Sequence, residues 1–235
     1  YYFSKIPNLN RMILDKKELY NESYEEELRR VIEQELGSKF RNYVWPDTAD
    51  AIPDNRELKL LILHPEDRGD QITTWMERKG QSFREHKNTL FFAIADTAAF
   101  TQLREGVKTY LALQEIDNEV KADPKSPLTV RRSEIQSRMH NIQREYSYNV
   151  RRMYHVVMAG TRRIDLGQPM SGPEALGNWY WRELTSHDVG AIVEHLHYRM
   201  IVNRLMAGNE QVATNLILDQ FYKNTELPAP ASADV

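Results

Sequence analysis

Several features that the sequence lacks exclude whole classes of protein and of functional site. The sequence contains no cysteine, which excludes disulfide bonds, thiolate metal sites and cysteine nucleophiles, and fits a reducing compartment. It has no hydrophobic run long enough for a membrane helix, which needs about 20 apolar residues. The longest runs, LKLLIL and TLFFAIA, suit buried strands. No signal-peptide pattern opens the chain. We therefore expect a cytoplasmic protein without membrane contact.

Sequence motifs for nucleotide, hydrolase and metal chemistry are also missing. Nothing matches the phosphate-binding loop G-x-x-x-x-G-K-S/T, the nucleophile elbow G-x-S-x-G or the zinc motif H-E-x-x-H. His195 and His197 lie beside Glu194, but two residues apart on an expected helix they point to different sides and cannot share a metal. We therefore assign no catalytic, cofactor-binding or metal-binding residue, and expect no cofactor in this chain.

The composition is that of an ordinary globular protein. The chain has 235 residues, of which 41% are hydrophobic and 28% charged, enough for one large domain or two small ones. The formal net charge of -3 does not indicate a general polyanion binder. The first residue is Tyr and the tail reads PAPASADV, so we interpret the chain as a piece of a longer protein.

Alternating strand and helix patterns fill the first hundred residues. We expect strands in YYFS, RNYVW, ELKLLIL and NTLFFAIA, and a short helix or turn in QITTWMERKG. Asn8 is expected to cap a first helix, and Ser23 with Glu26 a second, as a capping box, with Gly37 as its stop. This order predicts an α/β fold with a small, mainly parallel sheet of about four strands and flanking helices.

Two long helical patterns follow and predict an antiparallel helical hairpin. On the first helix, one face is expected to hold Phe100, Leu103, Val107, Leu111 and Gln114, at spacings of three and four. The second comprises Ile135, Met139, Ile142, Tyr146, Val150, Met153 and Val157. The segment DPKSP breaks the chain between them, and Gly160 is expected to end the second helix.

The last third is expected to be a helical subdomain. A boundary is predicted in the loop GQPMSGPEALGN, and NWYWREL is ambiguous between strand and helix. Thr185 or Ser186 is expected to cap a helix through Val189, Ile192, Val193, Leu196 and Met200, and a last helix runs from about Asn209 to Tyr222. The predicted organisation is an α/β region with the hairpin over 1–160, a helical subdomain over 161–228 and a tail over 229–235.

Two acidic residues follow buried strands and are weak site candidates. Asp96 follows the apolar strand LFFAIA, and in P-loop ATPases an acid that helps to hold Mg²⁺ also follows an apolar strand. Thr97, however, stands where a catalytic Glu would be expected. Asp67 lies with Glu66 and Asp70 in the loop after the other buried strand, and three acids at the carboxyl end of a parallel strand can hold a divalent cation. The favoured interpretation is structural: Asp96 caps the next helix, and the second loop is solvated, with Asp70 as a cap.

The most basic stretch lies on the helix expected over 129–158. Its candidate contact residues are Arg138, Arg144, Arg151 and Arg152, with Arg131, Arg132, Arg162 and Arg163 nearby. Tyr146, Tyr148 and Tyr154 are interleaved with them. Such residues grip a nucleic-acid backbone or an acidic partner, although the arginines spread around most of the helix. A solvated, salt-bridged face is the other interpretation.

Four segments together resemble a known family. They are YYFSKIPNLNRMI, LKLLILHP, HKNTLFFAIAD and LILDQFYKNTELP, and they span most of the chain. In this order they resemble large prokaryotic P-loop ATPases, related to the AAA+ class, that carry the domain-of-unknown-function family 499 region. Some relatives act beside bacteriophage-defence clusters of the BREX kind. The resemblance implies that the nucleotide-binding core, with ATP and Mg²⁺, lies upstream in a parent protein.

Three functions therefore remain open from sequence. The leading hypothesis is a non-catalytic accessory or coupling module of a larger ATPase, in bacteriophage defence, whose partners are other regions of that ATPase. Self-association and nucleic acid are further candidate partners. The alternative is a nucleic-acid-binding module that uses the arginine-rich helix. A third hypothesis is an independent enzyme with a site in the loops after residues 63 and 95.

Overall fold

A five-stranded mixed sheet lies at the centre of the computed structural model, which describes residues 8–205 and 213–231. The strand order is β1-β2-β5-β6-β7. Strands β1 (Arg41–Val44), β2 (Lys59–Ile62) and β5 (Leu90–Ile94) are parallel, whereas β6 (Val156–Ala159) and β7 (Arg162–Asp165) are antiparallel. The predicted α/β class is confirmed. The expected sheet is confirmed only in part, because two antiparallel strands extend its parallel half.

The β6–β7 hairpin corrects the expected end of the long helix. Val157 belongs to β6 and not to the helical stripe, although its spacing fits that stripe. Gly160, expected as a helix stop, begins the two-residue turn of the hairpin with a φ of +57°. Only the first turn residue has a positive φ, as in a type II′ turn. The expected domain boundary after residue 160 falls inside this turn, and one core cluster takes residues from both sides of it.

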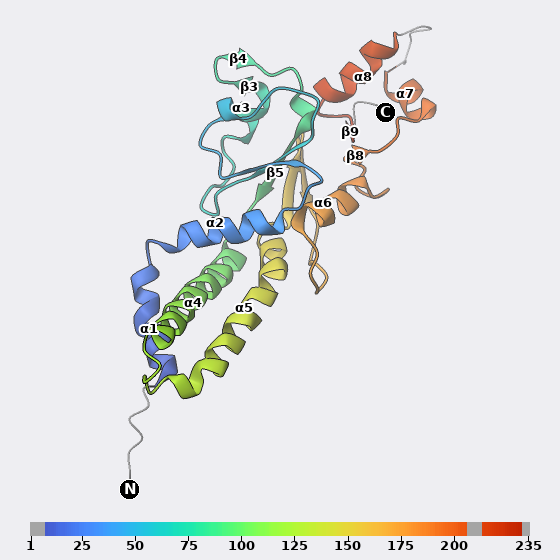
Figure 1. The fold of residues 1–235 in the computed structure, drawn as a ribbon. Helices are drawn as coiled ribbons and strands as arrows, with labels where there is room; N and C mark the ends of the chain where they lie inside the picture. The colour runs from blue at the N-terminus through green and yellow to red at the C-terminus, as the bar shows by residue number, and fades with distance from the viewer. Residues whose placement is uncertain (1–7, 206–212, 232–235) are drawn as a thin grey trace.

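An antiparallel helical hairpin is present, as predicted, but its second helix ends earlier and its buried face differs in part from the prediction. It consists of α4 (Thr97–Ala122) and α5 (Arg132–Met153), joined through a loop and the 3-10 turn η4 (Thr129–Arg131). Helix α1 (Leu9–Lys17) packs along its far half and continues into η1 (Glu18–Tyr20). We call α1, α4 and α5 together the helical arm. Figure 1 shows the arm leaving the sheet toward the described N-terminal end.

The buried face of α4 differs from the predicted stripe in its second half. Leu111 is only half-buried and Gln114 is exposed, while Leu113 and Ile116 are fully buried. The reason is a change of neighbour along the helix. Near the sheet α4 packs in the main core, and farther out it packs against α1 and α5 in a cluster of its own.

Helices cover both faces of the sheet. One face packs against α2 (Tyr24–Glu35), the near halves of α4 and α5, and α6 (Leu176–Thr185), which resolves the ambiguous NWYWREL segment as a helix. The other face packs against α3 (Ile72–Glu77) and against Ile52, which follows the 3-10 turn η2 (Ala49–Ala51). A small hairpin of β3 (Arg78–Lys79) and β4 (Ser82–Phe83) and the turn η3 (Lys87–Thr89) complete this region.

The helix ends test the expected caps. Asn8 caps α1 as predicted, since its side chain accepts hydrogen bonds from the amides of Asn10 and Arg11. Gly37 follows α2 with a φ of +72°, as a C-terminal stop requires. Ser23 precedes α2, but its side chain makes no capping bond, so the expected capping box is wrong. The three acids of the first turn, Glu25 to Glu27, favour this helix end electrostatically instead.

The C-terminal third differs most from its prediction. The helix expected after Ser186 is wrong: β8 (Ile192–Val193) lies there, and α7 (Tyr198–Leu205) begins only at Tyr198. Strand β9 (Ala229–Pro230), within the expected tail, pairs in parallel with β8 and is buried. The last helix is confirmed as α8 (Thr214–Lys223). Its expected start at Asn209, like the strand YYFS, falls outside the described residues.

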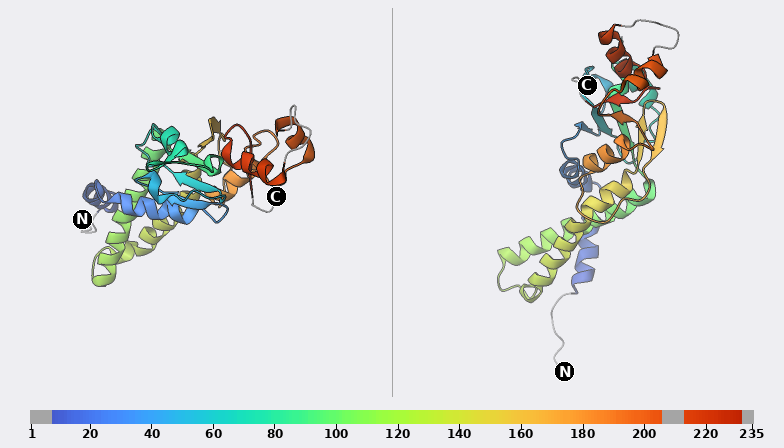
Figure 2. Two further views of the ribbon diagram at one scale, coloured as in Figure 1. Left: turned by 90° about the horizontal axis from the view of Figure 1, so that it is seen from above. Right: turned by 90° about the vertical axis from the view of Figure 1, so that its right-hand side faces the viewer.

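The elements form an elongated arrangement. Figure 2 shows the helical arm at one end of the sheet and α7 and α8 at the other. Asn88, in η3, fixes the α8 end, because its buried side-chain amide donates to the carbonyls of Phe221 and Leu227. Within the described ranges, no helix combines the length and apolar character that a bilayer span requires.

Candidate functional site

The junction between the helical arm and the sheet is built from very short connections. Two residues separate β5 from α4, and two separate α5 from β6. Asp96 caps α4 by accepting a hydrogen bond from the Ala99 amide at 2.7 Å, which confirms the structural interpretation of this acid. Its own amide donates to the carbonyl of Met153, the last residue of α5, at 2.7 Å. The two ends of the hairpin are therefore bonded to each other where they enter the sheet.

Tyr154 ties the same junction to two further elements. Its side chain is fully buried, and its hydroxyl donates to the carbonyl of Leu63, just beyond β2, at 2.8 Å. The Tyr180 hydroxyl of α6 donates to the Tyr154 carbonyl. Burial raises the pKa of both phenols well above its usual value, so both remain neutral donors at physiological pH. Any rotation of α5 at this point therefore strains β2 and α6.

Arg151 is a buried cation on the adjoining turn of α5. Only 1% of its surface is exposed, and its guanidinium donates to the carbonyls of Ser147 and Gly172 and to the Glu174 carboxylate. Arg182 of α6 pairs with the other oxygen of Glu174. Burial of a charged side chain is tolerated only with such complete pairing. Arg151 therefore fastens the loop before α6 to the helical arm, and it is removed from any surface interface.

The remaining predicted arginines do not converge on one surface. Arg138 pairs with Glu134 at 2.6 Å and also contacts Asn10, and Arg152 donates to Gln102 at 2.7 Å. These contacts hold α5 to itself, to α1 and to α4. Of the four candidate arginines, only Arg144 is exposed and makes no hydrogen bond or ion pair within the described part of the chain. The salt-bridged interpretation of this helix therefore describes Arg138 well.

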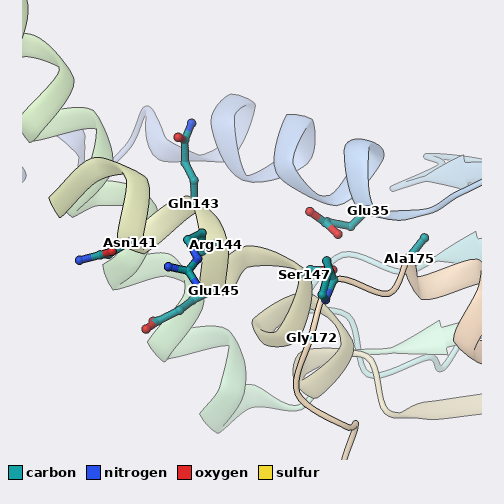
Figure 3. A pocket seen from close by; sticks show the side chains of 9 residues that line it. Glu35, Asn141, Gln143, Arg144, Glu145, Ser147, Gly172 and Ala175 are labelled. Atoms are coloured by element: carbon teal, nitrogen blue, oxygen red, sulfur yellow. The ribbon is translucent and has the colours of Figure 1, made fainter. Parts of the chain in front are cut away.

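Arg144 lies beside a hollow of about 750 Å³ between α2, α5 and the loop at 172–175. Figure 3 shows that Asn141, Gln143 and Glu145 leave α5 in different directions, so the lining side chains do not converge on one point. Glu35 approaches from α2, opposite Ser147. Such a divergent, mainly polar lining lacks the few convergent groups that orient a small ligand.

The second acidic candidate, Asp67, organises its own loop. Its carboxylate accepts from the Gly69 amide at 2.8 Å and from the Gln71 side chain. Asp70, expected as a helix cap, does not cap α3, because the residue that precedes this helix is Gln71 and no side chain bonds the helix end. Asp67 nevertheless lines two hollows beyond the carboxyl ends of the parallel strands, of about 650 and 480 Å³, whereas Asp96 lines neither.

The histidine cluster is also placed differently from the prediction. Glu194, His195 and His197 lie in the irregular segment between β8 and α7, and all three are exposed. The Glu194 carboxylate accepts a hydrogen bond from the Trp181 indole at 3.1 Å. In the parts of the chain that the structure describes, no three His, Asp or Glu residues are arranged to hold a metal ion.

Sequence reasoning missed Tyr154 and Arg151 as junction residues because it carried the helix through to residue 160. A signal for the correct division was present. The segment HVVMAGTRRID has two adjacent Val residues before a Gly at a two-residue turn, which is a hairpin pattern. A helix that ends before this hairpin places Tyr154 at the boundary.

Comparison with known proteins adds no assignment. No protein-family model, no curated protein and no solved structure matches the chain.

Proposed function

We propose that this chain is a non-catalytic accessory module of a larger P-loop ATPase, in which the helical arm couples movement of one region to another. The observation that carries the proposal is the junction. The arm enters the sheet through two-residue connections at both of its strands, and Asp96 and Met153 are bonded to each other there. A displacement of the far end is therefore passed to the sheet and is not absorbed by a loop.

The helical arm has the length and stiffness for this role. Helix α4 has 26 residues, and at 1.5 Å per residue it extends about 39 Å. Its far half has a core of its own, which includes Leu9, Leu113, Ile116 and Ile135. Ion pairs between the helices add to this core, as Lys16 of α1 bonds Glu115 and Glu119 of α4 at 2.6 and 2.7 Å. A packed three-helix unit resists bending better than a single helix.

The ATPase context rests on the four segments that resemble family 499 proteins. LKLLILHP contains β2, HKNTLFFAIAD contains β5 and the α4 cap, and LILDQFYKNTELP contains most of α8. These three segments supply two strands of the sheet and the end of the fold farthest from the arm, and the described part of the fourth, YYFSKIPNLNRMI, begins α1. On this proposal the nucleotide and Mg²⁺ are bound upstream in the parent protein, which acts in bacteriophage defence.

The test uses the parent protein and compares two insertions. Two glycines inserted between Asp96 and Thr97 loosen the junction, whereas two glycines inserted in the loop at 124–126 leave it intact. We expect the first insertion to change the ATPase rate of the parent protein and the second to leave it near the wild-type rate. Equal rates for all three proteins would contradict coupling through the arm. Mg²⁺-dependent ATP hydrolysis by the isolated chain would contradict the non-catalytic assignment.

Nucleic-acid contact through α5 is tested in the same protein. Arg144→Glu removes the one candidate arginine that is exposed and unpaired in the described structure. A phosphate contact would make binding weaken with salt and would lower the salt slope by about one on this substitution. Salt-sensitive DNA or RNA binding that is lost in this variant would favour the nucleic-acid-binding alternative.

A further inference from the structure

A separate cavity of about 650 Å³ lies beyond the carboxyl ends of β1 and β2. Its walls come from four places: the first turns of α2, the residues after β1, the residues after β2, and the start of α3. The carboxyl edge of parallel strands is where α/β proteins place ligands. The volume is within the usual range of ligand sites, about 300–1,000 Å³. None of the three hypotheses from sequence uses these residues together.

Aromatic rings form much of the wall. Trp45, His64 and Trp75 all line the cavity and are half-buried. The Trp45 and His64 rings meet edge to face with centroids 4.8 Å apart. Trp45 has a φ of +50°, a conformation that is uncommon for a bulky side chain and costs free energy. Its indole N–H lies 3.4 Å from the Tyr154 hydroxyl, so this strained position is held by the buried junction.

The charged groups at the cavity give it a negative balance. Glu25, Asp47 and Asp67 are three carboxylates against the single guanidinium of Arg29, which is a formal charge of -2 with His64 neutral. Arg29 is itself paired with Glu33 at 3.1 Å and donates to the Val44 carbonyl. His64 accepts a hydrogen bond at Nδ1 from the Glu66 amide at 3.3 Å.

Two of these carboxylates have no counter-ion. Within residues 8–205 and 213–231, Glu25 and Asp47 form no hydrogen bond or ion pair, and both are exposed. Asp67, by contrast, is engaged by the Gly69 amide and Gln71. The N-terminal end of α2 partly balances the charge of Glu25, which lies in its first turn, whereas Asp47 has no such neighbour. Negative charge without an ion pair therefore lies at the same cavity as three aromatic rings.

We propose that this cavity binds an organic ammonium group. An alkylated cation is attracted to the negative faces of indole rings, and unpaired carboxylates add to this attraction. An anion would be repelled by Glu25 and Asp47, and a neutral apolar ligand would gain nothing from them. The combination of Trp45, Trp75 and two free carboxylates thus selects positive charge with apolar surface.

The ammonium group has two possible sources, and the surroundings of the cavity suit both. A small free amine fits the cavity alone. A side chain of an extended peptide also fits, because a second hollow of about 540 Å³ runs along β1 and shares Arg29, Trp45, Pro46 and Asp47 with the first. Strand β1 ends the order of the sheet, so no described strand pairs with its outer side.

The test titrates the full chain with choline and with 3,3-dimethylbutan-1-ol. The second compound is the neutral isostere of choline, in which carbon replaces the quaternary nitrogen. Calorimetry measures affinity, and the indole N–H signals of the four tryptophans locate the site by NMR. We expect choline to bind saturably and to shift Trp45 and Trp75 while Trp179 and Trp181 stay unchanged. Equal affinity for the neutral isostere would overturn the proposal, as would the absence of saturable binding by any ammonium probe.

Matched variants separate charge and ring contributions from folding. Glu25→Gln should weaken choline binding severalfold, and less so at high salt, whereas Glu26→Gln on the same exposed helix turn should leave it unchanged. Trp45→Leu should weaken binding about two- to thirtyfold, the range of a cation–π contact, and Trp45→Phe should restore part of it. Equal effects of the two glutamate variants would place the cation elsewhere and refute the site.

A short peptide with one trimethylated lysine distinguishes the two sources. Affinity more than about tenfold above that of choline, lost on changing Asn42 to Lys in the β1 hollow, indicates a peptide ligand. Affinity equal to that of choline, unaffected by this variant, indicates a free amine. Failure of all ammonium probes would leave the coupling proposal intact, because the insertion experiment does not involve this cavity.

Discussion

The helical arm and the sheet region use charged side chains in different ways. In the arm, charges pair across helices at partly exposed positions, as Lys16 does with Glu115 and as Lys17 does with Glu105. In the sheet region, two cations, Lys59 and Arg84, are buried with 0% and 2% of their surfaces exposed, and they bond mainly to backbone carbonyls. Arg151, where α5 of the arm meets the sheet, is a third buried cation, with 1% of its surface exposed.

The buried cations organise loops that have little regular structure. Lys59 donates to the carbonyls of Asn55 and Glu57, and Arg84 donates to those of Ala49, Ile52, Pro53 and Trp75. A buried carbonyl without a partner is costly. Where no strand or helix satisfies the backbone, a long cationic side chain does so here. Charge thus fixes helix pairing in the arm and loop shape beside the sheet.

The largest expected effect on stability comes from a substitution in the far core of the arm, and it tests whether this core opens separately from the core at the sheet. Ile116→Ala leaves a void in the far core of the arm and should lower the free energy of unfolding by about 2–5 kcal/mol. Hydrogen exchange should rise in α1 and in the far halves of α4 and α5, while β5 amides keep their protection. Gln114→Ala, on the exposed side of α4, should change stability by less than about 0.5 kcal/mol. Loss of protection in β5 would show that the two cores open together.

A smaller effect is expected when a buried cation is removed. Arg151→Met removes the guanidinium that bonds the Gly172 carbonyl and one oxygen of Glu174. The expected cost is about 2–3 kcal/mol, because Glu174 is partly exposed and keeps its ion pair with Arg182. Urea unfolding measures the difference. Arg144→Met, on the same helix but exposed, provides the control and should be nearly neutral. Comparable losses in the two variants would refute a specific role for buried pairing.

At alkaline pH, the change of stability with pH should come from Lys59 in the sheet region. Burial, with a contribution from the Arg84 charge, lowers the pKa of Lys59 from 10.5 to about 8. Between these values the unfolded chain binds more protons than the folded chain, so stability should rise with pH from about 8 to 10.5. Lys59→Met should flatten this rise in urea unfolding followed at several pH values. A rise of the same size in the variant would assign it to another group.

At acid pH, part of the loss of stability should come from Asp117 in the arm, and this is the smallest of the expected effects. Burial raises the pKa of Asp117, but hydrogen bonds from Lys121 and Arg132 outweigh it, so the pKa lies below 3.8. The stabilisation is therefore present above pH 3.8 and is lost as pH falls through the lower folded value. Asp117→Asn should remove this part of the acid transition, as measured by circular dichroism. An unchanged transition would contradict the assignment.

The parts of the fold that were predictable from sequence are those with long periodic patterns. The helical hairpin and the buried strands β2 and β5 carry runs that allow few interpretations. Strand β6 was not predicted, because Val157 happens to continue the apolar spacing of the preceding helix. The segment around Ile192 reads as an amphipathic helix, but it pairs with Ala229, a partner far away in sequence that no local pattern reveals.

The candidate sites show the same limit. Asp96 was predictable as a cap because the bond it makes is local, three residues ahead. The burial of Arg151 depends on a loop more than twenty residues away, and the cavity at Trp45 depends on residues from β1, β2, α2 and α3. Composition and spacing along one helix therefore predicted exposed arginines, whereas tertiary contacts decide which of them are exposed.

The position of the helical arm also sets an order of events during folding. Strands β5 and β6 are antiparallel neighbours, a pair that a tight turn ordinarily joins. Here the whole segment from 97 to 153 lies between them, so their pairing from an open chain carries the entropy of a long loop. Prior formation of the α4–α5 hairpin shortens that loop to the distance between two helix ends. Helix pairing should consequently precede sheet completion, and substitutions in the hairpin should slow refolding more than substitutions in β7.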